Sequence, residues 1–91
     1  MNEFVEIDGN LIKKDSITCL TKIVMGFMGA FIFNSHEKFE FKLEYDGKYL
    51  IFEEYFKINL FSSKHENKIK KDVAYYNISQ KRKEILEKIS K

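Results

Sequence analysis

The sequence has one cysteine, no proline, no tryptophan and only four glycines in 91 residues. A single cysteine cannot close an internal disulfide, which excludes a small secreted module held together by disulfides. No apolar run reaches the roughly 18 residues that a membrane-spanning helix needs. The first residues, Met-Asn-Glu-Phe-Val-Glu, lack the basic start and long apolar stretch of a secretory signal. These absences predict a cytoplasmic protein in which Cys19 is a reduced thiol and a small core residue.

The residues that are present fit one folded domain. A hydrophobic fraction of 44% is ordinary for a folded chain, and 91 residues leave no room for a second core. We therefore predict a single domain over residues 1–91. Residues 1–63 carry 7 Lys/Arg and 10 Asp/Glu, whereas residues 64–91 carry 9 and 4. An acidic body with a basic end suits a polyanion, a mixed protein surface or no partner at all.

Residues 39–52 contain the clearest local pattern. Apolar residues alternate with charged ones up to Tyr45, Asp46-Gly47 follows, and a second apolar run begins at Lys48. Asp-Gly between two such runs favours a hairpin with a two-residue turn. The predicted hairpin places its apolar pairs on one face, as in a half-buried antiparallel sheet. Its facing pairs are Tyr45 with Lys48, Leu43 with Leu50, and Phe41 with Phe52.

Other stretches complete an α+β prediction. Residues 3–7 and 17–23 have the composition or the period of two that is typical of strands, and residues 55–61 are predicted to continue the hairpin. Residues 62–71 are polar and predict a loop. From Asp72, the expected N-cap, the period becomes helical, with an apolar stripe at Tyr75, Ile78, Ile85, Leu86 and Ile89. We predict a small antiparallel sheet of about four to five strands followed by one C-terminal amphipathic helix.

Two residue sets resemble catalytic or metal sites and have simpler explanations. In the predicted register Glu40 faces Glu53, and two close carboxylates can split their pKa values or hold a divalent cation. The alternative is a solvated outer face. Cys19, His36 and His65 are the only soft or imidazole ligands, and they lack the short spacings of zinc sites. We therefore predict no catalytic residues, no metal and no cofactor, and expect that the protein is not an enzyme.

The most apolar stretch, residues 24–33, is the first candidate for binding. If its glycines place Met25, Phe27 and Met28 on a hairpin tip, these side chains form a flexible apolar loop suited to a protein contact. The alternative is a buried central strand, which would put them in the core. Tyr49 and Tyr55 extend the candidate surface, because aromatic rows on a sheet suit edge pairing or a homodimer.

The basic segment 64–91 is the second candidate for binding. Its lysines lie close in sequence to Tyr75 and Tyr76, and basic residues with nearby aromatics suit a phosphate backbone and stacked bases. The alternative is a solvated helix face. The candidate contacts to nucleic acid are Lys70, Lys71, Lys81, Arg82 and Lys83.

Three segments resemble small proteins of phages and other mobile elements. They are the opening VEIDGNLIKKDSITCLTKIV, the hairpin FEFKLEYDGKYLIF and the terminal KRKEILEKIS, together about half of the chain. Such proteins often act as stoichiometric inhibitors of host defence, anti-CRISPR proteins among them. The resemblance implies a non-catalytic inhibitor or adaptor that works by protein contact, for example against a host-defence nuclease. It assigns no residues, because these inhibitors share no motif. The alternative function is a nucleic-acid-binding module using residues 64–91.

Overall fold

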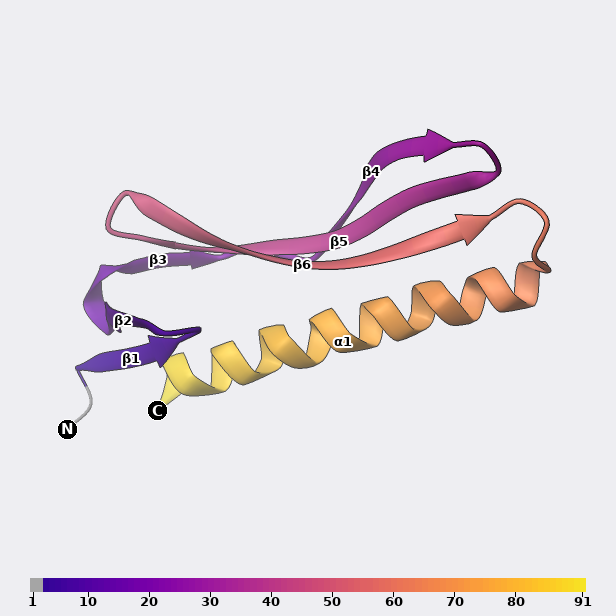
Figure 1. Cartoon of the computed structure of the whole chain (residues 1–91). Helices are drawn as coiled ribbons and strands as arrows, with labels where there is room; N and C mark the ends of the chain where they lie inside the picture. Colours follow the sequence, from indigo (N-terminus) through magenta and orange to yellow (C-terminus); the bar gives the residue numbers. More distant parts are fainter. Residues whose placement is uncertain (1–2) are drawn as a thin grey trace.

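The computed structural model of the chain describes residues 3–91 and has the predicted α+β architecture (Figure 1). Antiparallel strands are followed by one long C-terminal helix, so the fold class is confirmed. The sequence of elements is β1 (Phe4–Ile7), β2 (Asn10–Lys13), a short 3-10 helix (Lys14–Ser16), β3 (Ile17–Leu20), β4 (Val24–Phe31), β5 (Asn34–Tyr45), β6 (Lys48–Asn59) and α1 (Lys64–Ser90).

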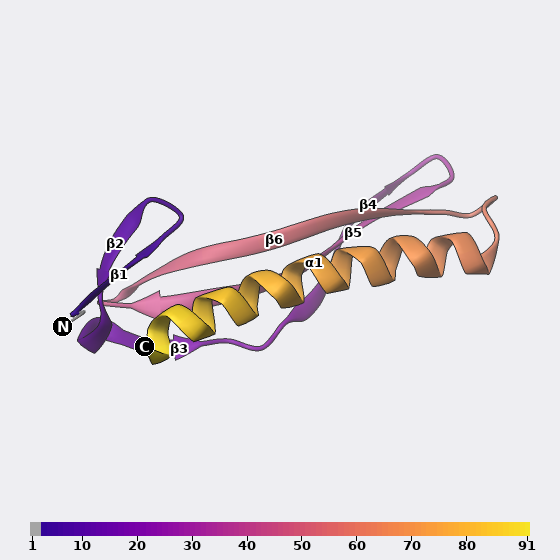
Figure 2. The ribbon, with the colours of Figure 1, turned by 90° about the horizontal axis from the view of Figure 1, so that it is seen from below.

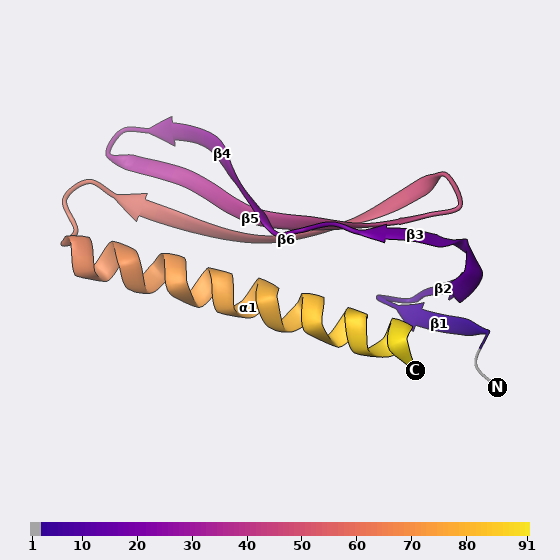
Figure 3. The same ribbon diagram turned by 180° about the vertical axis from the view of Figure 1, so that it is seen from behind.

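The main sheet is built around β5. β6 pairs with β5 along one side, while β4 and β3 pair one after the other along its opposite side. α1 runs beneath one face of this sheet and leaves the other face uncovered (Figures 1 and 3). The described chain is elongated, with extents of 53 × 22 × 20 Å.

The β5–β6 hairpin has the predicted register. All three facing pairs are present, and the pairing continues without a shift to Asn34 and Asn59. Asp46 and Gly47 have φ values of 47° and 71°, as a type I′ turn requires. This turn matches the right-handed twist of the strands, so Asp-Gly fixes which side chains face α1.

The core lies between the main sheet and α1. Phe41 and Leu43 of β5 are fully buried, and the ring of Phe41 stacks on that of Phe52 with centroids 4.9 Å apart. From the helix, Ala74, Ile78 and Ile85 close this layer. β1 and β2 form a separate hairpin that adds Val5, Ile7 and Ile12 to the same core.

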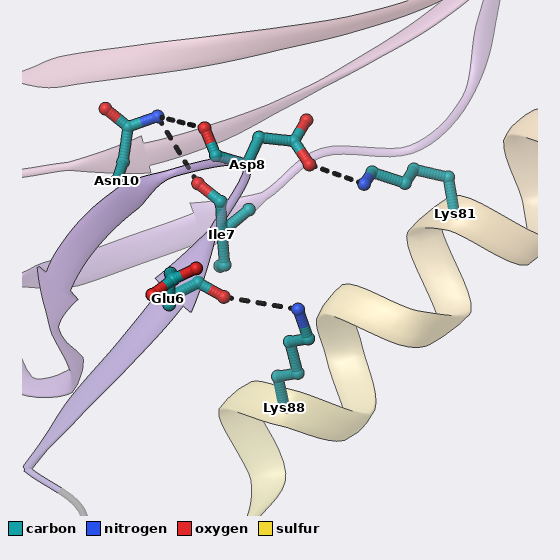
Figure 4. A network of polar contacts seen from close by, with 6 residues as sticks. All are labelled: Glu6, Ile7, Asp8, Asn10, Lys81 and Lys88. Atoms are coloured by element: carbon teal, nitrogen blue, oxygen red, sulfur yellow. Dashed lines mark hydrogen bonds and ion pairs between the residues drawn. The ribbon is translucent and has the colours of Figure 1, made fainter.

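Polar contacts hold the β1–β2 hairpin against the C-terminal half of α1 (Figure 4). Lys81 Nζ lies 2.6 Å from Asp8 Oδ1, and Lys88 Nζ donates to the carbonyl oxygen of Glu6 at 3.2 Å. The side-chain amide of Asn10 donates to the carbonyls of Ile7 and Asp8 within the turn. Two lysines of the basic segment 64–91 therefore help to hold the N-terminal β1–β2 hairpin against the helix.

The predicted start of the helix is wrong. α1 begins at Lys64 rather than after Asp72, so the segment predicted as a loop forms its first two turns. Ser63 is the N-cap, and its hydroxyl accepts a hydrogen bond from the backbone N–H of Glu66 at 3.1 Å. Ser-x-x-Glu is the capping-box pattern, a helix-start signal that the search for apolar periodicity did not use. The predicted stripe is also shifted: Ala74, Ile78 and Ile85 are buried, whereas Tyr75 and Leu86 are exposed.

The prediction that Cys19 lies in the core is also wrong, because its side chain is exposed. The β3–β5 register shifts between Ile17 and Cys19, and Cys19 comes to lie opposite Glu44. Since Glu44 alternates with the buried Leu43, this shift turns the thiol to the uncovered face of the sheet.

Candidate functional site

The structure places Met25, Phe27 and Met28 in an arrangement that neither sequence interpretation described. They lie in a strand, not at a hairpin tip, yet that strand is the exposed edge strand β4 and not a buried central one. All three side chains are exposed. A register shift between Phe27 and Gly29 marks a bulge, where Met28 lines a shallow hollow with His36 and Tyr55.

A second group of exposed apolar residues lies at the end of the molecule where β4 ends. The β4–β5 turn and the β6–α1 connection meet there (Figure 1), as Leu60 N donates to Phe33 O at 2.9 Å. The rings of Phe33 and Phe61 contact edge to face with centroids 4.4 Å apart, and Phe61 remains 75% exposed. We call this surface the apolar tip and define it as Phe31, Ile32, Phe33, Leu60 and Phe61, all of which are exposed.

The backbone of Ile32 strengthens the case that the tip has a role. Ile32 has a φ of 56°, the left-handed region that β-branched residues avoid. Turns at such positions ordinarily use Gly, Asn or Asp. An exposed isoleucine in this conformation adds backbone strain and exposed apolar area together, and such outliers gather at functional sites. The sequence signal that we did not use is an apolar pair directly before a polar pair, Ile-Phe before Asn-Ser and Leu-Phe before Ser-Ser; in the structure both apolar pairs form the connections themselves.

Tyr49 and Tyr55 lie on β6, on the face of the sheet that α1 does not cover. Their partners on β5 are Glu44 and Lys38, which alternate with the buried residues of that strand. Both tyrosines are exposed, and Lys42 Nζ lies 5.0 Å from the ring centroid of Tyr49. They belong to a different surface from the apolar tip.

The facing carboxylates Glu40 and Glu53 are present as predicted, with Lys38 beside both. Lys38 Nζ bonds to the carboxylate of Glu53 and lies 3.8 Å from Glu40 Oε1. The hydrogen bond from Lys38, with a second from Tyr55, lowers the pKa of Glu53 below its ordinary value of 4.5. The same bond raises the pKa of Lys38. A general acid near neutral pH needs a raised carboxyl pKa, so this arrangement is that of an ion pair.

The five basic residues predicted to contact nucleic acid do not converge on one surface. Side chains turn by about 100° per residue around a helix. Lys70 and Lys81 therefore lie on one flank of α1, Lys71 and Arg82 on the other, and Lys83 on the outer side. Lys81 pairs with Asp8, and Arg82 Nε donates to the carbonyl oxygen of Thr21 at 2.9 Å. Two of the five thus hold the fold together.

No group of three or more potential metal ligands from His, Cys, Asp and Glu occurs within residues 3–91. His36 lies in β5 and His65 in the first turn of α1. In the same part of the chain, no helix is long and apolar enough to cross a membrane. Comparison of the chain with protein-family models, curated proteins and solved structures finds no match.

Proposed function

We propose that this protein is a non-catalytic binding protein that acts by stoichiometric contact with another protein, like the phage inhibitors and adaptors that it resembles. The apolar tip is the observation that carries the proposal. A soluble monomer rarely exposes a contiguous apolar patch larger than a few hundred Å² unless a partner covers it. Met25, Phe27 and Met28 add three exposed apolar side chains on the same strand as Phe31.

The size of the exposed surface supports the same proposal. The chain has an accessible surface of 6590 Å². A compact monomer of 10.9 kDa is expected to expose roughly 5,600 Å². The excess is comparable to the roughly 800 Å² that one partner buries in a standard protein interface.

The ion pair on the sheet supports the non-catalytic part of the proposal. The only facing carboxylates that the sequence predicted are Glu40 and Glu53. Lys38 bonds to Glu53 and lowers the pKa of that carboxyl, and it lies 3.8 Å from Glu40 Oε1. A cytoplasmic setting belongs to the proposal as well, since the exposed Cys19 has no second cysteine to pair with.

A capture experiment with tip variants tests the proposal. The tagged chain is incubated with bacterial lysate treated with nuclease, and bound protein is quantified at low and high salt. We expect one partner at equimolar ratio, retained at high salt because apolar burial is not screened. The double variant Ile32→Ser/Phe61→Ser is expected to reduce capture by about tenfold or more, as loss of a hot spot does. Alanine at Met25, Phe27 and Met28 is expected to weaken capture while the fold stays intact.

The matched control is Leu11→Ser, because Leu11 is an exposed leucine in β2, at the opposite end of the molecule (Figure 1). This variant should capture the partner as the parent chain does. Equal loss in the control and the tip variant would contradict the proposal. Recovery of nucleic acid alone, only without nuclease and only at low salt, would instead favour the basic segment 64–91.

A further inference from the structure

β6 presents an unpaired edge on the side of the main sheet away from β4. Among residues 3–91 it pairs with β5 alone, and it runs alongside α1 in Figure 2. The two-residue turn makes Tyr45 and Lys48 a hydrogen-bonded pair, so alternate residues of β6 from Lys48 onward bond to β5. The residues between them direct N–H and C=O outward: Tyr49, Ile51, Glu53, Tyr55, Lys57 and Asn59.

Asn59, the last of these residues, shows that the edge accepts a partner. Its N–H donates to Oδ1 of Asn67 at 3.1 Å, and Nδ2 of Asn67 donates to its carbonyl oxygen at 2.8 Å. The Asn67 side chain thus bonds to β6 as a neighbouring strand would, and it closes the edge at this end. Among the described residues, no hydrogen bond of this kind reaches the outward N–H and C=O groups of β6 from Tyr49 to Lys57.

The two edges of the main sheet differ in their protection. β4 carries a bulge, a device that turns an edge away from further pairing. β6 pairs with β5 from Lys48 to Asn59 without a register shift. A long regular edge with outward N–H and C=O groups is a template for one more strand.

A groove runs beside this edge, between β6 and the N-terminal half of α1. Phe56 and Ala74, both buried, belong to its lining, and Ile69 and Val73 of the helix line it as exposed apolar side chains. We call it the β6–α1 groove and define it as Glu54, Phe56, Lys57, Ile69, Lys70, Val73 and Ala74. A strand added to β6 points every second side chain toward the helix side of the sheet, which is where the groove lies.

The helix has two exposed apolar residues along this groove. Ile69 and Val73 are four residues apart and both line the groove, whereas Tyr76, seven residues before Lys83, lies on the outer side of the helix. All three are exposed, and they are separate from Ala74, Ile78 and Ile85 in the core. β-branched residues at exposed helical positions lower helix propensity, and a strand seated in the groove would cover Ile69 and Val73.

The charge of the groove indicates the chemistry of that partner. Glu53 bonds to Lys38, and Glu54 Oε1 accepts from Asn77 Nδ2 at 3.3 Å. Lys57 and Lys70 line the same hollow and form no ion pair among the described residues. Two lysines against the single carboxylate of Glu54 leave the hollow with a net positive charge, which suits an acidic side chain.

We propose that β6, from Ile51 to Lys57, binds an extended acidic segment of a partner protein as an additional strand. Main-chain hydrogen bonds to the outward N–H and C=O groups supply affinity, and alternate apolar side chains of the segment lie in the β6–α1 groove. An Asp or Glu of the segment pairs with Lys57 and Lys70. This site is distinct from the apolar tip and does not depend on the function proposed above.

Peptide selection tests the proposal. Displayed random peptides of about twelve residues, long enough for a strand along this edge, are selected on the immobilised full chain. Enriched peptides are expected to alternate apolar and polar residues and to carry Asp or Glu. Affinity of one labelled enriched peptide is then measured by fluorescence anisotropy. Val73→Glu and the double variant Lys57→Glu/Lys70→Glu are each expected to weaken binding by about tenfold or more.

The matched control is Val24→Glu, which places the same charge at an exposed valine on the opposite edge strand β4. It should change affinity by less than about twofold, and Ile32→Ser/Phe61→Ser should likewise leave peptide binding unchanged. N-methylation of alternate peptide amides should abolish binding in one of the two possible sets and spare the other, because only one set faces β6. Circular dichroism of each variant checks that the fold is retained.

Three results would overturn the proposal. One is an enriched peptide that binds Val73→Glu as tightly as the parent chain. Another is a peptide whose binding tolerates both N-methylated sets. The third is a chain that dimerises through this edge in light scattering and becomes monomeric on Tyr55→Lys, which would make a second copy the occupant.

Discussion

At the scale of single residues, Ile32 is where stability and the proposed function conflict. Its φ of 56° places a β-branched side chain in the left-handed region, which costs an L-residue about 1–2 kcal/mol. The side chain is 71% exposed and recovers little of that cost by burial. Phe33, the other turn residue, at least contacts Phe61. The polar pair Asn34-Ser35 follows directly but belongs to β5, so the turn itself is formed by two apolar residues.

Ile32→Asn is therefore expected to stabilise the protein and to weaken partner capture. Asparagine tolerates the left-handed region, so the free energy of unfolding in urea should rise by about 1 kcal/mol. Loss of the isoleucine removes apolar area from the tip, which should reduce capture in the lysate experiment. Val24→Asn is the control, because Val24 is an exposed β-branched residue within a strand, where asparagine brings no gain. A destabilised Ile32→Asn variant would show that the side chain is structural.

At the scale of elements, the sequence predicts the hairpin well and the helix start poorly, for one physical reason. The register of β5 and β6 follows from local information, namely alternation and an Asp-Gly turn, and all three predicted pairs are present. The first turns of α1 contain a single apolar residue, Ile69, so periodicity cannot detect them. That part of the helix depends on its cap and on long-range contacts such as Asn67 with Asn59.

The exposed surfaces depend even more on contacts that are distant in the sequence. Composition marks residues 24–33 as apolar, but only the pairing with β5 shows that they form an edge strand. The apolar tip joins Phe33 to Phe61, and the β6–α1 groove joins Phe56 to Val73. Neither pair is close in sequence, so local patterns could not place them together.

The cap gives a prediction for the first turns of α1. Ser63→Ala removes the acceptor for the Glu66 N–H and is expected to lower the free energy of unfolding by about 1 kcal/mol. Amide hydrogen exchange should accelerate first in residues 64–70, because a helix frays from an uncapped end. Ser62→Ala is the matched control, since no side-chain hydrogen bond of Ser62 contributes to the cap. Unchanged exchange in Ser63→Ala would mean that packing and the Asn67 contact alone hold this end.

At the scale of the whole molecule, the shape follows from two layers that are both long and narrow. A helix of 27 residues extends for roughly 40 Å at about 1.5 Å per residue. It covers one face of a sheet whose two longest strands, β5 and β6, have twelve residues each. No second layer covers the other face within the described chain (Figure 3). The tip and the β6 edge are therefore both left open by the same architecture, one at its end and one along its side.

This shape is measurable in solution. The Cα radius of gyration is 16.0 Å, whereas a compact domain of 91 residues has roughly 12 Å. We expect X-ray scattering of the isolated chain to give a value near 16 Å, with a forward intensity that corresponds to one copy. Leu11→Ser serves as the control that leaves the dimensions unchanged, since Leu11 is exposed and outside the core. A value near 12 Å would mean that the tip folds back onto the body, in which case its apolar side chains are covered by the chain itself and are not available to a partner.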